Sequence, residues 1–214
     1  MNDRSVRGFT LIEMMMALAI IGVLAAIALP MMTNSIKYEK ISGDARDISN
    51  DIAVAKMRAA AKFTQARIYA DLNGNQYRLQ TCNDPTTLPC QAWTTENSWV
   101  GLSSTTSFGY GTVSSAPLNT QTTIGQGDTT PLPNPPPAFD GLCKDGSPLA
   151  DVANTACVIF NSRGIPVTPS GSPTGGDALY ITDGSFCYGV TVAATGFIRT
   201  WRTNVTSTPN WVLQ

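Results

Sequence analysis

One carboxylate, Glu13, lies inside an apolar run that extends from Phe9 to Leu29. Inserting such a carboxylate into bilayer hydrocarbon costs about 2.5–3.5 kcal/mol. The charge is explained if Glu13 gains a cationic partner when the helix leaves the bilayer for a helical bundle. A free amino terminus on a neighbouring copy would serve, and cleavage before Phe9 would make Glu13 the fifth mature residue. In the alternative, Glu13 belongs to a simple signal anchor and reaches the membrane interface.

The rest of the chain offers little catalytic chemistry. It has no histidine, so the commonest general base and metal ligand are missing. The net charge is −1, which gives no overall attraction to nucleic acid or acidic lipid. Five carboxylates stand in turn-like contexts with no recognised calcium-ligand spacing: Asp140, Asp145, Asp151, Asp177 and Asp183. We therefore expect neither an enzyme nor a metal or cofactor site.

The chain also has five cysteines, which could form disulfides or bind a metal: Cys82, Cys90, Cys143, Cys157 and Cys187. Their spacing does not match paired zinc motifs, and across a membrane they would meet an oxidising compartment. The odd count predicts two disulfides and one free thiol, with the first four cysteines as the disulfide candidates. Cys82 and Cys90 enclose a turn-rich insert and are expected to pair locally. The remaining connectivity is open.

The elements that carry these residues begin with a long helix. Residues 1–8 are a short leader with Arg4 and Arg7, and residues 9–29 are long and apolar enough to span a bilayer. Arginines before the span predict a cytoplasmic amino terminus. Pro30 is expected to kink or locally unwind the helix. From residue 30 to 63 an apolar stripe at helical spacing predicts an amphipathic stem that packs on a globular head; its members are Ile41, Ala45, Ile48, Ile52, Ala55, Ala59 and Phe63.

Residues 64–214 change to the period of a β-strand. Asn73-Gly74 between two β-prone runs predicts a hairpin, because both residues tolerate positive φ. Short strands with regular turns return from Cys157 to the end of the chain. Residues from about 103 to 150 are expected to form a Pro-rich surface insertion, or alternatively a docking motif. The predicted fold is α+β, with the long helix packed on an antiparallel β-sheet or β-sandwich.

The stretch Gly8-Phe9-Thr10-Leu11-Ile12-Glu13, with Pro30 behind it, resembles the signal of type IV pilins and type II secretion pseudopilins. The resemblance implies that prepilin peptidase cleaves between Gly8 and Phe9 and methylates the new amino terminus. It also implies assembly with other pilins through Leu11, Ile12 and Glu13. A secretory cleavage after Ala28 is the alternative, but it leaves the hexad unexplained.

A looser pattern is similar to the FimT/GspH branch of minor pilins and minor pseudopilins. It comprises Ala55–Ala59 in the stem, Val158–Gly164, and a terminal hairpin with Thr195–Arg199. The implied protein is a filament subunit with a single pass through the bacterial inner membrane. Its head would be periplasmic before the subunit enters a periplasmic or extracellular filament, assembled by an inner-membrane platform.

Some FimT-like pilins bind DNA through arginines near the carboxy terminus, which gives a second hypothesis. Arg199 and Arg202, with Trp201 between them, could contact phosphates and stack on a base. No arginine directly follows Gly196, so the spacing departs from the family pattern. In a strand the two arginines would also point to opposite faces. The alternative is that they are solvated arginines beside a packed tryptophan.

Overall fold

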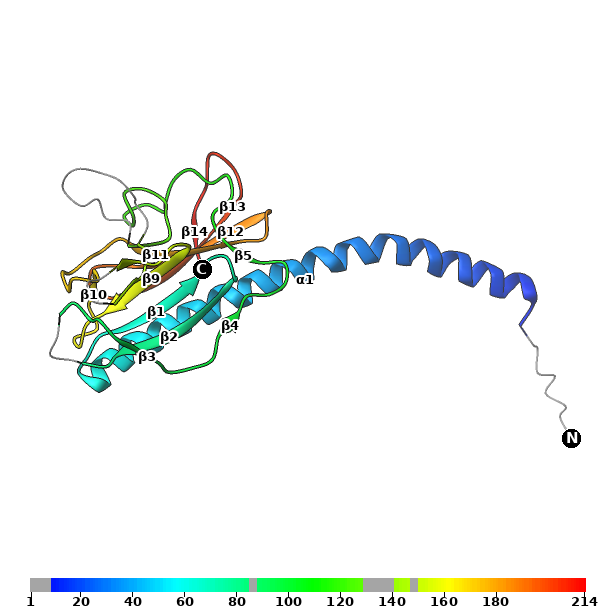
Figure 1. Cartoon of the computed structure of the whole chain (residues 1–214). Coiled ribbons are helices and arrows are strands. Elements are labelled where there is room, and N and C mark those ends of the chain that lie inside the picture. The colour runs from blue at the N-terminus through cyan, green and yellow to red at the C-terminus, as the bar shows by residue number, and fades with distance from the viewer. Residues whose placement is uncertain (1–8, 85–87, 129–140, 147–149) are drawn as a thin grey trace, which may run out of the picture. The chain divides into compact units, whose positions relative to one another are not determined.

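The computed structural model describes residues 9–84, 88–128, 141–146 and 150–214. The chain divides into two compact units, residues 1–39 and residues 40–214. One α-helix, α1, runs from Leu11 to Lys62 (Figure 1). The helix is continuous through Pro30, so the local unwinding that this proline suggested is not present.

The stem portion of α1 in the second unit buries the apolar stripe that the sequence predicts. Ile41, Ile48 and Ile52 are fully buried, as are the alanines of the stripe, Ala45, Ala55 and Ala59. Phe63, the last member of the predicted stripe, is instead 79% exposed. The helix ends at Lys62, and Phe63 takes a left-handed backbone with φ 53°. The amide of Thr64 then donates to the carbonyl of Ala59, which closes the helix end in a Schellman arrangement.

Two antiparallel sheets make up the head. Sheet A has the order β10-β9-β1-β2-β3, with β4 also paired to β2. Its strands are β1 (Ala66–Asp71), β2 (Gln76–Cys82), β3 (Trp93–Thr95), β4 (Val100–Gly101), β9 (Thr155–Phe160) and β10 (Pro166–Val167). Sheet B has the order β14-β13-β12-β11-β5, with β6 also paired to β11. Its strands are β5 (Ser107–Phe108), β6 (Gly127–Asp128), β11 (Asp177–Thr182), β12 (Phe186–Val192), β13 (Ile198–Asn204) and β14 (Val212–Leu213). A small sheet pairs β7 (Lys144–Asp145) with β8 (Ala150–Asp151).

The predicted α+β fold is confirmed, because a long helix with an apolar first half packs on antiparallel sheets. The β1–β2 hairpin forms, but its turn differs from the expected one. Asn75 carries the positive φ of 48°, and the Gly74 amide donates to the Asp71 carboxylate at 3.0 Å. The reversal spans Leu72–Asn75, so it begins one residue before the predicted turn Asn73-Gly74-Asn75.

The main core lies where the stem meets the inner faces of both sheets. Its residues come from α1, β1, β2, β9, β11 and β12. A second core covers the other face of sheet A and includes Tyr69, Ile159 and the Cys143–Cys157 disulfide. A third core lies on the other face of sheet B and includes Val113, Ile124 and Tyr180.

The range from 103 to 150 contributes to this architecture. Strands β5 and β6 pair with β11, and Val113 and Ile124 are buried. The side-chain amide of Gln126 donates to the carbonyl of Tyr180, and its oxygen accepts from the Tyr180 amide, each at 2.8 Å. The proline run at 131–137 lies outside the described residues.

Candidate functional site

The first turn of α1 joins Thr10 and Glu13. The Glu13 amide donates to the Thr10 hydroxyl oxygen at 3.3 Å, and the Thr10 amide donates to the Glu13 carboxylate at 3.4 Å. This reciprocal pair is a capping box, which satisfies amides that have no partner within the helix. The sequence shows its signature, a threonine followed three residues later by a glutamate. The sequence led us to expect Glu13 either in assembly or at the membrane interface of a simple anchor, and neither expectation included this cap.

The apolar run behind the cap is exposed along its whole length. Leu11–Ala28 has a mean hydropathy of 2.5, and none of it is buried. By length and composition this is the one described helix that could cross a membrane. Phe9 is 82% exposed, and Leu11 and Ile12 are also exposed. An apolar surface on every side of a helix requires lipid or other helices around it.

The structure describes one of the two residues at the predicted cleavage junction. Phe9 is described and precedes the helix, whereas Gly8 lies outside the described residues. The backbone of Pro30 is helical. The processing and assembly roles of these residues stay predictions that geometry alone does not test.

Four of the five cysteines are paired. Cys82 binds Cys90, the local pair expected from the turn-rich insert, and Cys143 binds Cys157. Cys187 is a fully buried free thiol, and burial raises its pKa to about 12. The described residues contain no group of three or more His, Cys, Asp or Glu side chains that could hold a metal ion.

The arginines considered for DNA binding are separated by the strand. Successive residues of β13 pair in an unbroken register with β12, so Arg199 and Arg202 alternate onto opposite faces. Each guanidinium lies over a different ring, Arg199 at 5.4 Å from Phe197 and Arg202 at 5.8 Å from Phe186. The Trp201 indole donates to the Thr191 hydroxyl at 2.9 Å. The three side chains do not form one surface, and DNA binding stays a prediction.

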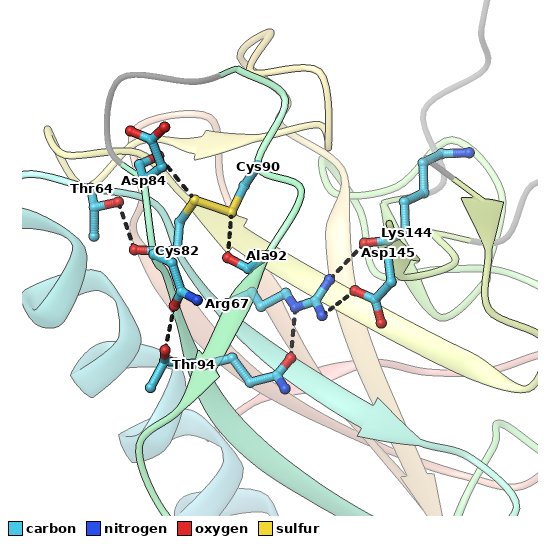
Figure 2. The surroundings of a disulfide bond; sticks show 11 residues. Thr64, Arg67, Cys82, Asp84, Cys90, Ala92, Thr94, Lys144 and Asp145 are labelled. Atoms are coloured by element: carbon cyan, nitrogen blue, oxygen red, sulfur yellow. Dashed lines mark hydrogen bonds and ion pairs between the residues drawn. A yellow bond between two sulfur atoms is a disulfide. The ribbon is translucent and has the colours of Figure 1, made fainter. Parts of the chain in front are cut away.

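A buried arginine that the sequence analysis did not single out ties the outer face of sheet A together. Arg67 is 1% exposed and donates to Gln80 at 2.8 Å, to the Lys144 carbonyl at 3.0 Å and to Asp145 at 2.6 Å (Figure 2). Its guanidinium also lies 4.1 Å from the Trp93 ring centroid. Burial lowers the Arg67 pKa, and Asp145 opposes that shift. Because these contacts occupy the donors, the cluster has a structural rather than a catalytic geometry.

A second buried charge has no such partners. Asp177 is 1% exposed, and among the described residues neither of its carboxylate oxygens has a hydrogen-bond partner. It faces Asp128 across the β6–β11 pair. Burial, and then the Asp128 charge, raise the pKa of Asp177 well above its ordinary value. Folding therefore makes ionisation of this carboxyl less favourable than it is for an exposed aspartate.

The stem and two distant turns meet around Lys56. Its ammonium donates to the carbonyl of Gly196 at 2.9 Å. A Cβ on Gly196 would lie 2.3 Å from the Gly164 carbonyl oxygen, and one on Gly164 would lie 3.0 Å from the Lys56 chain. Both glycines also have positive φ. The three segments that carry the looser FimT/GspH pattern thus come together at one place.

Comparison with known proteins assigns the amino-terminal segment. A protein-family profile described as the prokaryotic N-terminal methylation motif matches residues 3–29. No curated protein and no solved structure matches the chain. The chain therefore carries a prepilin-type signal. That signal implies a type IV pilin or pseudopilin, a structural protein anchored in the membrane before it assembles with other pilins.

Proposed function

We propose that this chain is a minor pilin or minor pseudopilin, a subunit of a type IV pilus or a type II secretion filament. Prepilin peptidase cleaves it between Gly8 and Phe9 and methylates the new amino terminus. The observation that carries the proposal is the methylation motif at residues 3–29, which includes the apolar and unburied helix segment Leu11–Ala28. Neighbouring pilin helices would cover that surface.

The first turn of α1 suggests how the precursor and the mature subunit differ. In the precursor, the Thr10 cap gives the Glu13 carboxylate hydrogen bonds while the helix is stored in the inner membrane. Cleavage creates an amine at Phe9, and an α-amino group is largely protonated near neutral pH. Glu13 then gains a cation, from its own chain or a neighbour. An ion pair in an apolar bundle sets register more than it adds net stability, because desolvation offsets much of the attraction.

The contacts around Lys56 support the FimT/GspH branch. The stem lysine and the turns at Gly164 and Gly196 form one tight junction that places the stem against the head. In this assignment, the head is periplasmic before assembly and is carried into the filament with the helix.

The test compares Glu13→Ala and Glu13→Gln with the wild type and with Glu39→Gln, an exposed control on the same helix. Intact mass and amino-terminal sequencing should give a mature chain that starts at N-methylated Phe9 when prepilin peptidase is present, and the uncleaved precursor when it is absent. Both Glu13 variants should insert into the membrane but fail to enter filaments, because both lose the negative charge. Glutamine can still accept the capping hydrogen bond, so its failure would assign the defect to the charge rather than to the cap. The Glu39 control should assemble.

Two outcomes would remove the proposal. A chain that keeps Met1, or that is cut after Ala28, is not a prepilin. Filaments that incorporate Glu13→Ala at the wild-type level would show that the carboxylate has no assembly role.

A further inference from the structure

The outer face of sheet A carries a row of side chains in which aromatic rings and guanidinium groups alternate. In order along the face, the row consists of Trp93, Arg67, Tyr69, Arg78 and Trp99. The Arg67 guanidinium carbon lies 4.1 Å from the Trp93 ring centroid and 5.1 Å from that of Tyr69. The Arg78 guanidinium carbon lies 5.3 Å from the Tyr69 centroid and 4.2 Å from that of Trp99. Cation–π attraction stabilises such a row, which we call the cation–π row.

The two arginines of the row differ in what surrounds their charge. Arg67 is 1% exposed and its charge is compensated by Asp145. Arg78 is only partly buried, and no described residue forms a hydrogen bond or an ion pair with its side chain. Its Nε is buried and unpaired, whereas its two terminal nitrogens keep accessible surface. The Arg78 guanidinium is therefore already partly desolvated and still lacks an anion.

Trp99 holds the Arg78 end of the row in place and leaves it open to solvent. The connection from β3 to β4 is fixed to β2, because the Glu96 amide donates to the Leu79 carbonyl at 2.9 Å and the Leu79 amide donates to the Asn97 side-chain oxygen at 2.8 Å. Trp99 follows directly and is 39% exposed. The guanidinium thus lies between two rings before any partner arrives, which reduces the entropy lost on binding.

Arg67 shows, on the same face, what such a guanidinium binds. One of its terminal nitrogens donates to the Asp145 carboxylate at 2.6 Å, and the other donates to the Lys144 carbonyl at 3.0 Å (Figure 2). Both acceptors belong to β7, so Arg67 holds a short extended segment through one acidic side chain and the adjacent backbone. Arg78 has the same planar set of donors, which matches a carboxylate, and has no such segment opposite it.

Asp71 limits how much negative charge this surface accepts. It lies on the same face as Tyr69, two residues further along β1. Its carboxylate accepts from the Gly74 amide at 3.0 Å and from the Gln76 side chain at 3.2 Å, and it forms no ion pair with Arg78. Because this charge lies beside the surface, a partner with one acidic residue is matched better than a partner with a run of acids.

We propose that Arg78 and Trp99 form a docking surface for an extended segment of another protein molecule that carries one acidic side chain. The terminal nitrogens of Arg78 bind the carboxylate, and the exposed part of Trp99 packs against the neighbouring part of the segment. The surface lies on the head and does not use the amino-terminal helix. The proposal therefore goes beyond the filament role and does not depend on it.

The test uses a capped Ala-Asp-Ala tripeptide as the probe and a capped Ala-Asn-Ala tripeptide as its uncharged match. Fluorine NMR is recorded on the full-length chain in lipid nanodiscs, with its four tryptophans replaced by fluorotryptophan. Trp99→Phe assigns the Trp99 resonance. The acidic probe should shift that resonance saturably at low salt, and the shift should weaken as salt is added. The uncharged probe should leave it unchanged.

Arg78→Gln should weaken binding of the acidic probe at least about tenfold, because a charge-assisted hydrogen bond is lost. Arg46→Gln, which removes an exposed arginine of the stem, is the matched control and should bind as wild type. Arg78→Lys keeps the charge without the planar donor pair, so it should bind more weakly than wild type and more tightly than Arg78→Gln. The other three tryptophan resonances report whether each variant is folded.

Three outcomes would overturn the proposal. The first is a Trp99 resonance that does not respond to millimolar acidic probe at low salt. The second is equal binding by wild type, Arg78→Lys and Arg78→Gln. The third is a shift produced by a short oligothymidylate and not by the acidic peptide, which would assign the ring and the arginine to single-stranded nucleic acid instead.

Discussion

The two halves of α1 differ in how their apolar residues are arranged and in whether those residues are buried. Leu11–Ala28 is apolar on every face, and none of it is buried. In the second half one stripe is fully buried, made of Ile41, Ala45, Ile48, Ile52, Ala55 and Ala59, whereas Met57 on another face is exposed. Polar residues on the other faces of this second half reach the head: Asp44 accepts from Ser103, and Asp51 accepts from the Tyr77 hydroxyl.

The difference shows where each half obtains its stability. The stem half satisfies its apolar surface within the chain, so its contribution is present in an isolated subunit. The described residues bury none of the first half, so its contribution depends on lipid or on other helices. Substitutions of one chemical kind should therefore have different effects in the two halves.

The largest expected effect comes from equal truncations in the two halves. Ile48→Ala should lower the free energy of unfolding of the head by about 2–5 kcal/mol, because it leaves a cavity in the main core. Ile20→Ala should change it by less than about 0.5 kcal/mol, because that side chain is exposed. Denaturation of the full chain in detergent, followed by the fluorescence of the four head tryptophans, measures both. Equal losses would contradict the division between the halves.

A smaller effect, of opposite sign, is expected inside the head. The pKa of Asp177 is raised by burial and by Asp128, so the folded chain keeps a proton that the unfolded chain releases. Stability should therefore be greatest below the ordinary aspartate pKa and fall as pH rises from there to the folded-state pKa.

Asp177→Asn should remove this dependence and raise stability at neutral pH by on the order of 1 kcal/mol. Thermal melts from pH 4 to pH 8 check it, with the exposed Asp47→Asn as the control. A variant that keeps the wild-type slope would show that Asp177 is not the source.

The smallest effect concerns the cap of the apolar half. Thr10→Val removes the hydroxyl that accepts from the Glu13 amide and should destabilise the first turn by about 1 kcal/mol. Thr10→Ser keeps the oxygen and should behave as wild type. Hydrogen exchange of the amides of residues 10–14 in micelles distinguishes them. Unfolding of the head should not respond to either variant.

The spacing of apolar residues was sufficient to predict most of the helix and strand positions. The stem stripe and the alternating strands fold as the sequence predicts, because burial on one face enforces a 3.6- or 2-residue period. Phe63 fits the stripe by spacing, yet it is exposed, since the helix ends one residue earlier. A left-handed backbone at a helix end is usually indicated by glycine or asparagine, so the phenylalanine at this position did not predict it.

The amino-terminal signal was visible because all its residues are adjacent in the chain. The arrangements in the head were not, because they join distant segments. Arg67 takes its partners from Gln80, Lys144 and Asp145, and nothing near Arg67 in sequence indicates them. Gln65 is similarly unremarkable in sequence, and only the structure shows that its amide is buried without a partner.

Because the thiol of Cys187 is buried, its reactivity can report whether the strands of sheet B have paired correctly. In the folded chain this fifth cysteine is inaccessible, and its raised pKa keeps it protonated. A chain in which β11 and β12 fail to pair would expose this free thiol, which could then exchange with the two native disulfides. Alkylation of Cys187 would then distinguish mature heads from misfolded ones, and a thiol-blocking reagent would act as a quality-control probe during assembly.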